Sequence, residues 1–198
     1  MKRIEDLVIR LRSVLGIPDD VRPASLDTLT RMQIAGVISD FGVQDDVSAK
    51  AAAAWLSDKR IISISPQAWA DMQSIDASET RFTTYHEIGH AVLGHSNRLR
   101  KFGGDKQFGA RTDFEEDEAD LFAEAFAVPL SHAFKAPLHD ISLFTAYSGL
   151  PPKHAERRMA FLQRYIRELT AAVSDGEPED SYSEAMSIMR MNAISWNS

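Results

Sequence analysis

The stretch from Arg81 to His95, RFTTYHEIGHAVLGH, constrains this chain more than any other, because it contains the motif H-E-x-x-H. On a helix, His86 and His90 project from one face, one turn apart. Two imidazoles held in that way can share one zinc ion, with the carboxylate of Glu87 beside the open position as a general base. The alternative is a core helix that carries two histidines by chance, since the motif has only three fixed positions.

The residues around the motif favour a helix. Apolar or small side chains recur there at helical spacing, namely Phe82, Tyr85, Gly89, Val92 and Leu93. Asp76 with Glu79, or Ser78, offers a start signal for this helix. Gly94 offers a stop, because glycine readily adopts the left-handed conformation that ends many helices.

The composition narrows the possible ligands and partners. The chain has 198 residues and no cysteine, which leaves histidines and carboxylates as the strong zinc ligands. The formal net charge is −7 and no Lys/Arg block is present, so we expect no direct nucleic-acid binding. The basic N-terminus is interrupted by charged residues and indicates an amphipathic helix rather than a signal peptide. No run is long enough to span a membrane, and we expect a cytoplasmic protein.

Apolar residues at helical spacing predict helices over residues 2–15, 25–40, 67–74, 139–147 and 153–172. The Ala-rich stretch 49–56 is also predicted to be helical, after a polar connection over residues 41–47. A short β-branched run, Ile61 to Ile64, predicts a strand, and Pro66 after it is typical of an edge or terminal strand. In zinc peptidases an edge strand pairs with extended substrate, although an ordinary structural strand is the alternative.

These elements predict an α+β protein that is mostly helical, with a small β-sheet preceding the helix of the motif. We expect a single domain over residues 1–173, made of an N-terminal helical region over residues 1–55 and a core over residues 56–173. The two N-terminal helices could form a helix-turn-helix, but basic residues are sparse there, which favours packing around the core. Residues 174–198 are expected to be a linker and tail, because they begin with the polar run SDGEPEDSYS.

A catalytic zinc ion normally has three protein ligands and a water, so one ligand is still missing. A third histidine in the pattern H-E-x-x-H-x-x-G-x-x-H has the wrong spacing here. His95 would point about 180° away from His86 if the helix continued, at about 100° per residue. Between this helix and the next, Gly103, Gly104 and Gly109 predict a mobile loop near the site.

A carboxylate on the following helix is the better candidate. The sequence T-D-F-E predicts a capping box with Thr112 as N-cap, and the helix should stop before Pro129. Its small-residue face, formed by Ala119, Ala123 and Ala127, permits close approach of another helix. Glu116 is the favoured third ligand, with Asp120 on the same face to hydrogen-bond the outer nitrogen of a ligand histidine. Glu118, about 200° around the helix from Glu116, remains the alternative ligand.

Together, RFTTYHEIGHAVLGH and the later EEDEADLFAEAFAVP resemble the ImmA/IrrE family of zinc metallo-endopeptidases. Its members show an Arg-Phe-Thr lead into H-E-x-x-H, then a Glu, an Ala-Asp or Ala-Asn pair, Phe-Ala and a closing Pro. Here these residues are Arg81, Phe82, Thr83, His86, Glu87, His90, Glu116, Ala119, Asp120, Phe122, Ala123 and Pro129. The resemblance covers about residues 60–130 and, more loosely, the helix that contains Ala155 and Arg158. Residues 1–55 and 174–198 do not match.

The resemblance implies a zincin-like (thermolysin-like) metallopeptidase domain that holds Zn²⁺ and hydrolyses a peptide bond in a specific protein substrate. A transcriptional repressor is the kind of substrate that the family suggests. The alternative is a non-proteolytic regulatory module that uses the same fold to bind a repressor or sensor protein. A hydrolase would also need an oxyanion donor, and the sequence does not choose among Tyr85, His132, His139, Tyr147 and His154.

Overall fold

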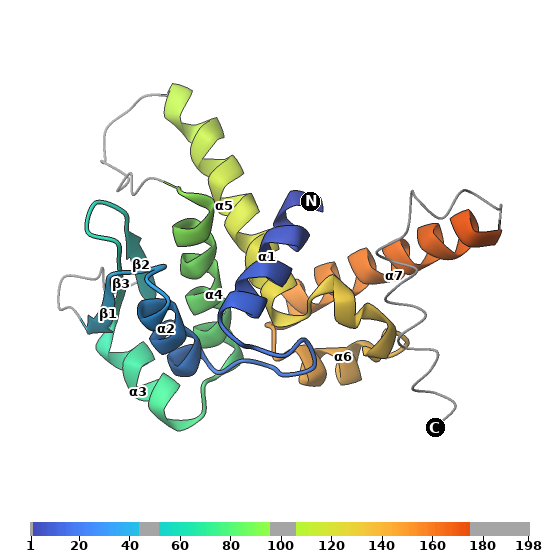
Figure 1. The fold of residues 1–198 in the computed structure, drawn as a ribbon, viewed down its shortest axis with the longest axis horizontal. Coiled ribbons are helices and arrows are strands. Elements are labelled where there is room, and N and C mark those ends of the chain that lie inside the picture. The colour runs from blue at the N-terminus through green and yellow to red at the C-terminus, as the bar shows by residue number, and fades with distance from the viewer. Residues whose placement is uncertain (1, 44–51, 96–105, 175–198) are drawn as a thin grey trace.

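The computed structural model describes residues 2–43, 52–95 and 106–174, and it is mostly helical with one small sheet (Figure 1). This arrangement agrees with the expected α+β class. In chain order the elements are α1 Lys2–Val14, α2 Ser25–Ile34, β1 Asp40–Val43, β2 Ala53–Leu56, β3 Ile61–Ile64, α3 Pro66–Ser74, α4 Ser78–Leu93, α5 Lys106–Ala127, the 3-10 helix η1 Leu130–Lys135, α6 Ile141–Ser148 and α7 Pro152–Ser174.

The three-stranded sheet has the order β1-β3-β2, with β3 parallel to β1 and antiparallel to β2. The strand predicted at Ile61 to Ile64 is confirmed as β3, but it is not an edge strand, because β3 is central and both Ile62 and Ile64 are fully buried. The Ala-rich helix predicted over 49–56 is also wrong where the structure describes this stretch. Residues 53–56 form β2, where pairing with β3 and burial of Trp55 outweigh the helical preference of alanine.

Several predicted boundaries change. Residues 41–43 belong to β1 rather than to a polar connection, so the N-terminal region over residues 1–55 contains strands as well as helices. The second helix ends at Ile34 instead of residue 40, because Gly36 has a positive φ of 71° and turns the chain. The predicted linker and tail lie outside the described residues, apart from Ser174 at the end of α7. Among the described helices, none combines the length and apolar character needed to cross a membrane.

The predicted start of the helix after the motif is wrong as well. This helix, α5, begins at Lys106, so Thr112 lies inside it and is no N-cap. Gly109 of the predicted loop is also helical, whereas Gly103 and Gly104 lie outside the described residues. The capping pattern T-D-F-E is a local signal, and it does not stop a helix from extending further toward the N-terminus.

The core lies between α4 and α5, which pack along one another in the middle of the molecule (Figure 1). Tyr85 and Ile88 of α4 and Phe122 and Phe126 of α5 are fully buried. The sheet, α2 and α3 contact α4, while α1 and α7 contact α5. The two N-terminal helices thus pack on the core, as the scarcity of basic residues suggested.

Gly89 sets how closely α4 and α5 approach. A Cβ added to Gly89 would lie 3.1 Å from the Cα of Ala119 and 3.1 Å from the Cβ of Phe122. These neighbours belong to the helix backbone and to a fully buried side chain, so they cannot easily give way. The predicted small-residue face of α5 therefore packs against α4 at Gly89, where Ala119 lies opposite the glycine.

We expect Gly89→Val to lower the free energy of unfolding by about 2–3 kcal/mol, because it overpacks the contact between α4 and α5. Chemical denaturation measures this loss. Gly42→Val is the matched control, since a Cβ at Gly42 meets nothing within 4 Å and its φ is not positive. Equal stability of the two variants would show that the helices can separate at little cost.

Candidate metal centre

Helix α4 carries the histidines of the motif, and both of its ends are fixed by local contacts. Its C-cap, Gly94, has the left-handed conformation with φ of 73°, so the predicted stop is confirmed. At the other end the N-cap is Ala77, and neither Asp76 nor Ser78 caps the helix. Instead, Asp76 accepts a hydrogen bond from Arg81 Nε at 3.1 Å. Arg81 also donates to the carbonyl of Gly149 at 3.1 Å, which ties the start of α4 to the turn before α7.

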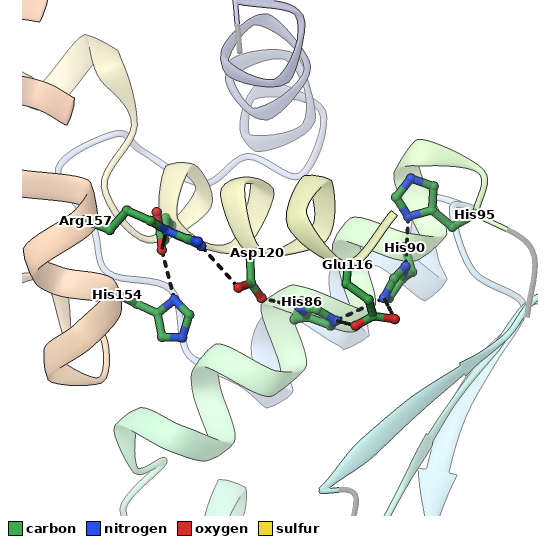
Figure 2. Close-up of polar contacts among 8 residues, drawn as sticks. His86, His90, His95, Glu116, Asp120, His154 and Arg157 are labelled. Atoms are coloured by element: carbon green, nitrogen blue, oxygen red, sulfur yellow. Dashed lines mark hydrogen bonds and ion pairs between the residues drawn. The ribbon is translucent and has the colours of Figure 1, made fainter. Parts of the chain in front are cut away.

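Three side chains converge on one point between α4 and α5 (Figure 2). His90 Nε2 lies 3.0 Å from His86 Nε2, which lies 3.2 Å from Glu116 Oε2. Glu116 Oε1 is 3.7 Å from His90 Nε2. A tetrahedral zinc ion with ligand bonds of about 2.0–2.1 Å would hold its ligand atoms about 3.3 Å apart. The donor types and their spacing fit a metal ion, so His86, His90 and Glu116 could hold one.

The outer nitrogen of His86 is held by the carboxylate that the sequence analysis suggested. Asp120 Oδ1 lies 2.8 Å from His86 Nδ1. The other oxygen of Asp120 accepts from Arg157 of α7 at 3.2 Å, and Arg157 Nε donates to the buried Glu124 at 2.6 Å. A carboxylate that fixes the ring of a ligand histidine is the usual support of a metal site. Helix α7 therefore contributes to the site through Arg157, which the sequence analysis missed.

Glu118 does not join this cluster. Its Oε2 lies 3.3 Å from Nε2 of His95. His95 Nδ1 in turn lies 2.8 Å from Nδ1 of His90 (Figure 2). The expectation that His95 points away assumed a continuing helix, but α4 ends at Leu93 and the chain turns at Gly94. The turn brings the His95 ring back beside His90. The backbone N–H of His95 donates to the His90 carbonyl at 3.0 Å.

Glu87 lies on the side of α4 that faces the sheet. Its Oε2 accepts a hydrogen bond from the backbone N–H of Trp55 in β2 at 2.6 Å. Burial raises the pKa of Glu87 to about 7, although the charge of His86 and the Trp55 N–H act against this rise. A carboxyl with a pKa near neutrality is suited to proton transfer.

The two histidines of the motif differ in protonation. Burial alone would lower the pKa of His86, but hydrogen bonds to Asp120 and Glu116 outweigh it and raise this pKa to about 9. Burial and the neighbouring charge of His86 instead lower the pKa of His90. The contacts of His86 thus favour its charged form, while the surroundings of His90 favour its neutral form.

Of the candidates for an oxyanion donor, Tyr85 is used elsewhere. It is fully buried, and its hydroxyl donates to the carbonyl of Pro23. His132 stacks on Tyr147 with ring centroids 6.0 Å apart. His154 stacks on Phe82 at 3.7 Å and places its Nδ1 2.9 Å from Glu124. The ring centroid of Phe82 in turn lies 6.2 Å from that of His86, so His154 contacts a neighbour of the cluster. His139 is exposed.

Comparisons with protein-family models, with curated proteins and with solved structures found no match.

Proposed function

We propose that this protein is a zinc-dependent endopeptidase, similar to the ImmA/IrrE family, that hydrolyses a peptide bond in a specific protein substrate such as a transcriptional repressor. The observation that carries the proposal is the convergence of His86, His90 and Glu116, with Glu87 next in sequence to a ligand and held from the sheet. A purely structural metal site has no use for a carboxylate at that position.

In the proposed mechanism His86, His90 and Glu116 hold the zinc ion. When bound, zinc lowers the pKa of a water and polarises a carbonyl. Glu87 accepts the proton of the attacking water and passes it to the leaving amine. The Trp55 N–H keeps the Glu87 carboxylate in one orientation, and Asp120 does the same for the His86 ring.

The structure suggests β2, rather than β3, as the strand that would pair with an extended substrate. The Ala52 carbonyl accepts a hydrogen bond from the backbone N–H of Ser65, the residue that follows β3. The backbone C=O of Ala52 therefore points toward β3. Backbone groups alternate along a strand, and Ala53 and Trp55 therefore direct theirs to the other edge. The Trp55 N–H does reach Glu87 there. A peptide added along that edge by β-augmentation would pair with the backbone of Ala53 and pass Glu87, which keeps the Trp55 N–H.

We expect removal of the metal to abolish hydrolysis and its return to restore it. The protein is stripped with a chelator, reloaded with one equivalent of zinc and incubated with a diverse proteome-derived peptide library, and mass spectrometry counts new termini. Wild type should bind about one zinc and His90→Ala none, because two protein ligands seldom retain the ion. Cleavage that survives chelation would contradict the proposal. One bound zinc without cleavage of the library or of a candidate repressor would favour a regulatory binding module.

A further inference from the structure

We propose that His95 and Glu118 are positioning residues, which hold His90 in the tautomer that presents Nε2 to a metal ion. The inference rests on the metal site of the proposed function, but it concerns how that site is prepared and not which reaction it performs. Glu118, His95 and His90 form a chain of hydrogen bonds that ends at the cluster. Figure 2 shows its inner link, between His95 and His90.

The backbone fixes where the His95 ring lies. Gly94, in the left-handed conformation, turns the chain after α4, and His95 N–H then bonds to the His90 carbonyl at 3.0 Å. On the other side, Trp55 Nε1 of β2 donates to the His95 carbonyl at 3.3 Å. The His95 side chain is only 8% exposed, and its ring centroid is 5.0 Å from that of His90. His95 is thus held from both sides, as a positioning residue must be.

The proton positions follow from the chain of contacts. The Glu118 carboxylate can only accept, so His95 donates from Nε2 across 3.3 Å. A neutral His95 that carries its proton on Nε2 has an acceptor at Nδ1. Since His95 Nδ1 and His90 Nδ1 are 2.8 Å apart, His90 is the donor of the pair. The free lone pair of His90 is then on Nε2, the atom 3.0 Å from His86 Nε2.

The two ligand histidines are therefore supported in two different ways by one helix. Asp120 of α5 contacts the outer nitrogen of His86 directly. Glu118, on another face of α5, reaches the outer nitrogen of His90 only through the ring of His95. Glu116, which would bind the metal itself, lies on the same helix. Outer partners of this kind typically contribute about 10- to 100-fold to metal affinity.

The test compares two replacements of His95. His95→Phe keeps a ring but removes the acceptor, and we expect it to weaken zinc binding about 10- to 100-fold. His95→Asn keeps an acceptor at the δ position and should restore most of the affinity. Glu118→Leu should weaken binding about tenfold, because His95 can then adopt the wrong tautomer. Asp117→Leu, at an exposed position of α5, is its control. Competition with a chromophoric chelator gives each dissociation constant, and thermal unfolding shows which variants are folded.

A direct readout is the tautomer itself. Long-range ¹H–¹⁵N spectra of the zinc-loaded wild type should show His90 protonated on Nδ1 and His95 protonated on Nε2 only. A proton on His95 Nδ1, or unchanged zinc affinity in a folded His95→Phe, would overturn the positioning role. Neither measurement uses hydrolysis. A protein with this relay and no peptidase activity would overturn the endopeptidase alone, whereas a wild type that binds no zinc would overturn both.

Discussion

Replacing Glu87 by Gln is expected to lower peptide-bond hydrolysis by about 100- to 10 000-fold, the usual contribution of a positioned general base. The amide has the shape of the carboxylate and can still accept the Trp55 N–H, so the fold and the cluster should persist. It cannot take a proton from water, because an amide is not basic at neutral pH. The loss should therefore appear in the rate of cleavage and not in the zinc content.

Glu79→Gln is the matched control for this variant. It makes the same chemical change on the same helix, at an exposed position in the first turn of α4. Both proteins are loaded with zinc and assayed on one cleaved peptide by mass spectrometry. Wild-type activity in Glu87→Gln, with full zinc content, would show that Glu87 is not the base. Loss of zinc from the same variant would mean that its carboxylate supports the metal instead.

The helix of the motif was predictable because its signals are local. His86 and His90 share a face by helical geometry alone, and Gly94 ends the helix by its backbone preference. The pairing of Asp120 with His86 follows from the same periodicity once α4 and α5 touch. Helical spacing along α4 and α5 was therefore enough to predict the ligand histidines and the carboxylate that supports His86.

The sheet and the position of His95 depend on features that local spacing does not show. Alanine at 53 and 54 favours a helix locally, yet β2 forms because Ala53 pairs with Ile64 of β3. The order of the strands, which makes β2 and not β3 an edge, leaves no mark in a short apolar run. His95 was misjudged for a related reason. Once Gly94 ends the helix, a rotation count no longer gives the direction of the next side chain.

Replacing Arg12 by Met is expected to lower the free energy of unfolding by about 3–5 kcal/mol, the largest stability change that we predict, because three hydrogen bonds from a charged group are lost. Arg12 is fully buried on α1 and donates to the carbonyls of Phe126 and Val21, each at 2.7 Å, and to that of Pro18. The Phe126 carbonyl is left unpaired inside the protein, at a cost of about 1–3 kcal/mol, whereas Pro18 and Val21 are exposed residues. Methionine fills some of the space but has no donor, so this cost is not recovered.

The same change should reach the metal centre, because Phe126 belongs to α5, the helix that carries Glu116 and Asp120. Arg12→Lys tests the geometry, since one ammonium group cannot serve three separated carbonyls, and we expect an intermediate loss of stability. Arg10→Met, at an exposed position of the same helix, should change the free energy of unfolding by less than about 0.5 kcal/mol. Urea denaturation with and without zinc measures all three variants. Equal stability of Arg12→Met and Arg10→Met would mean that the burial of the guanidinium costs as much as its hydrogen bonds return.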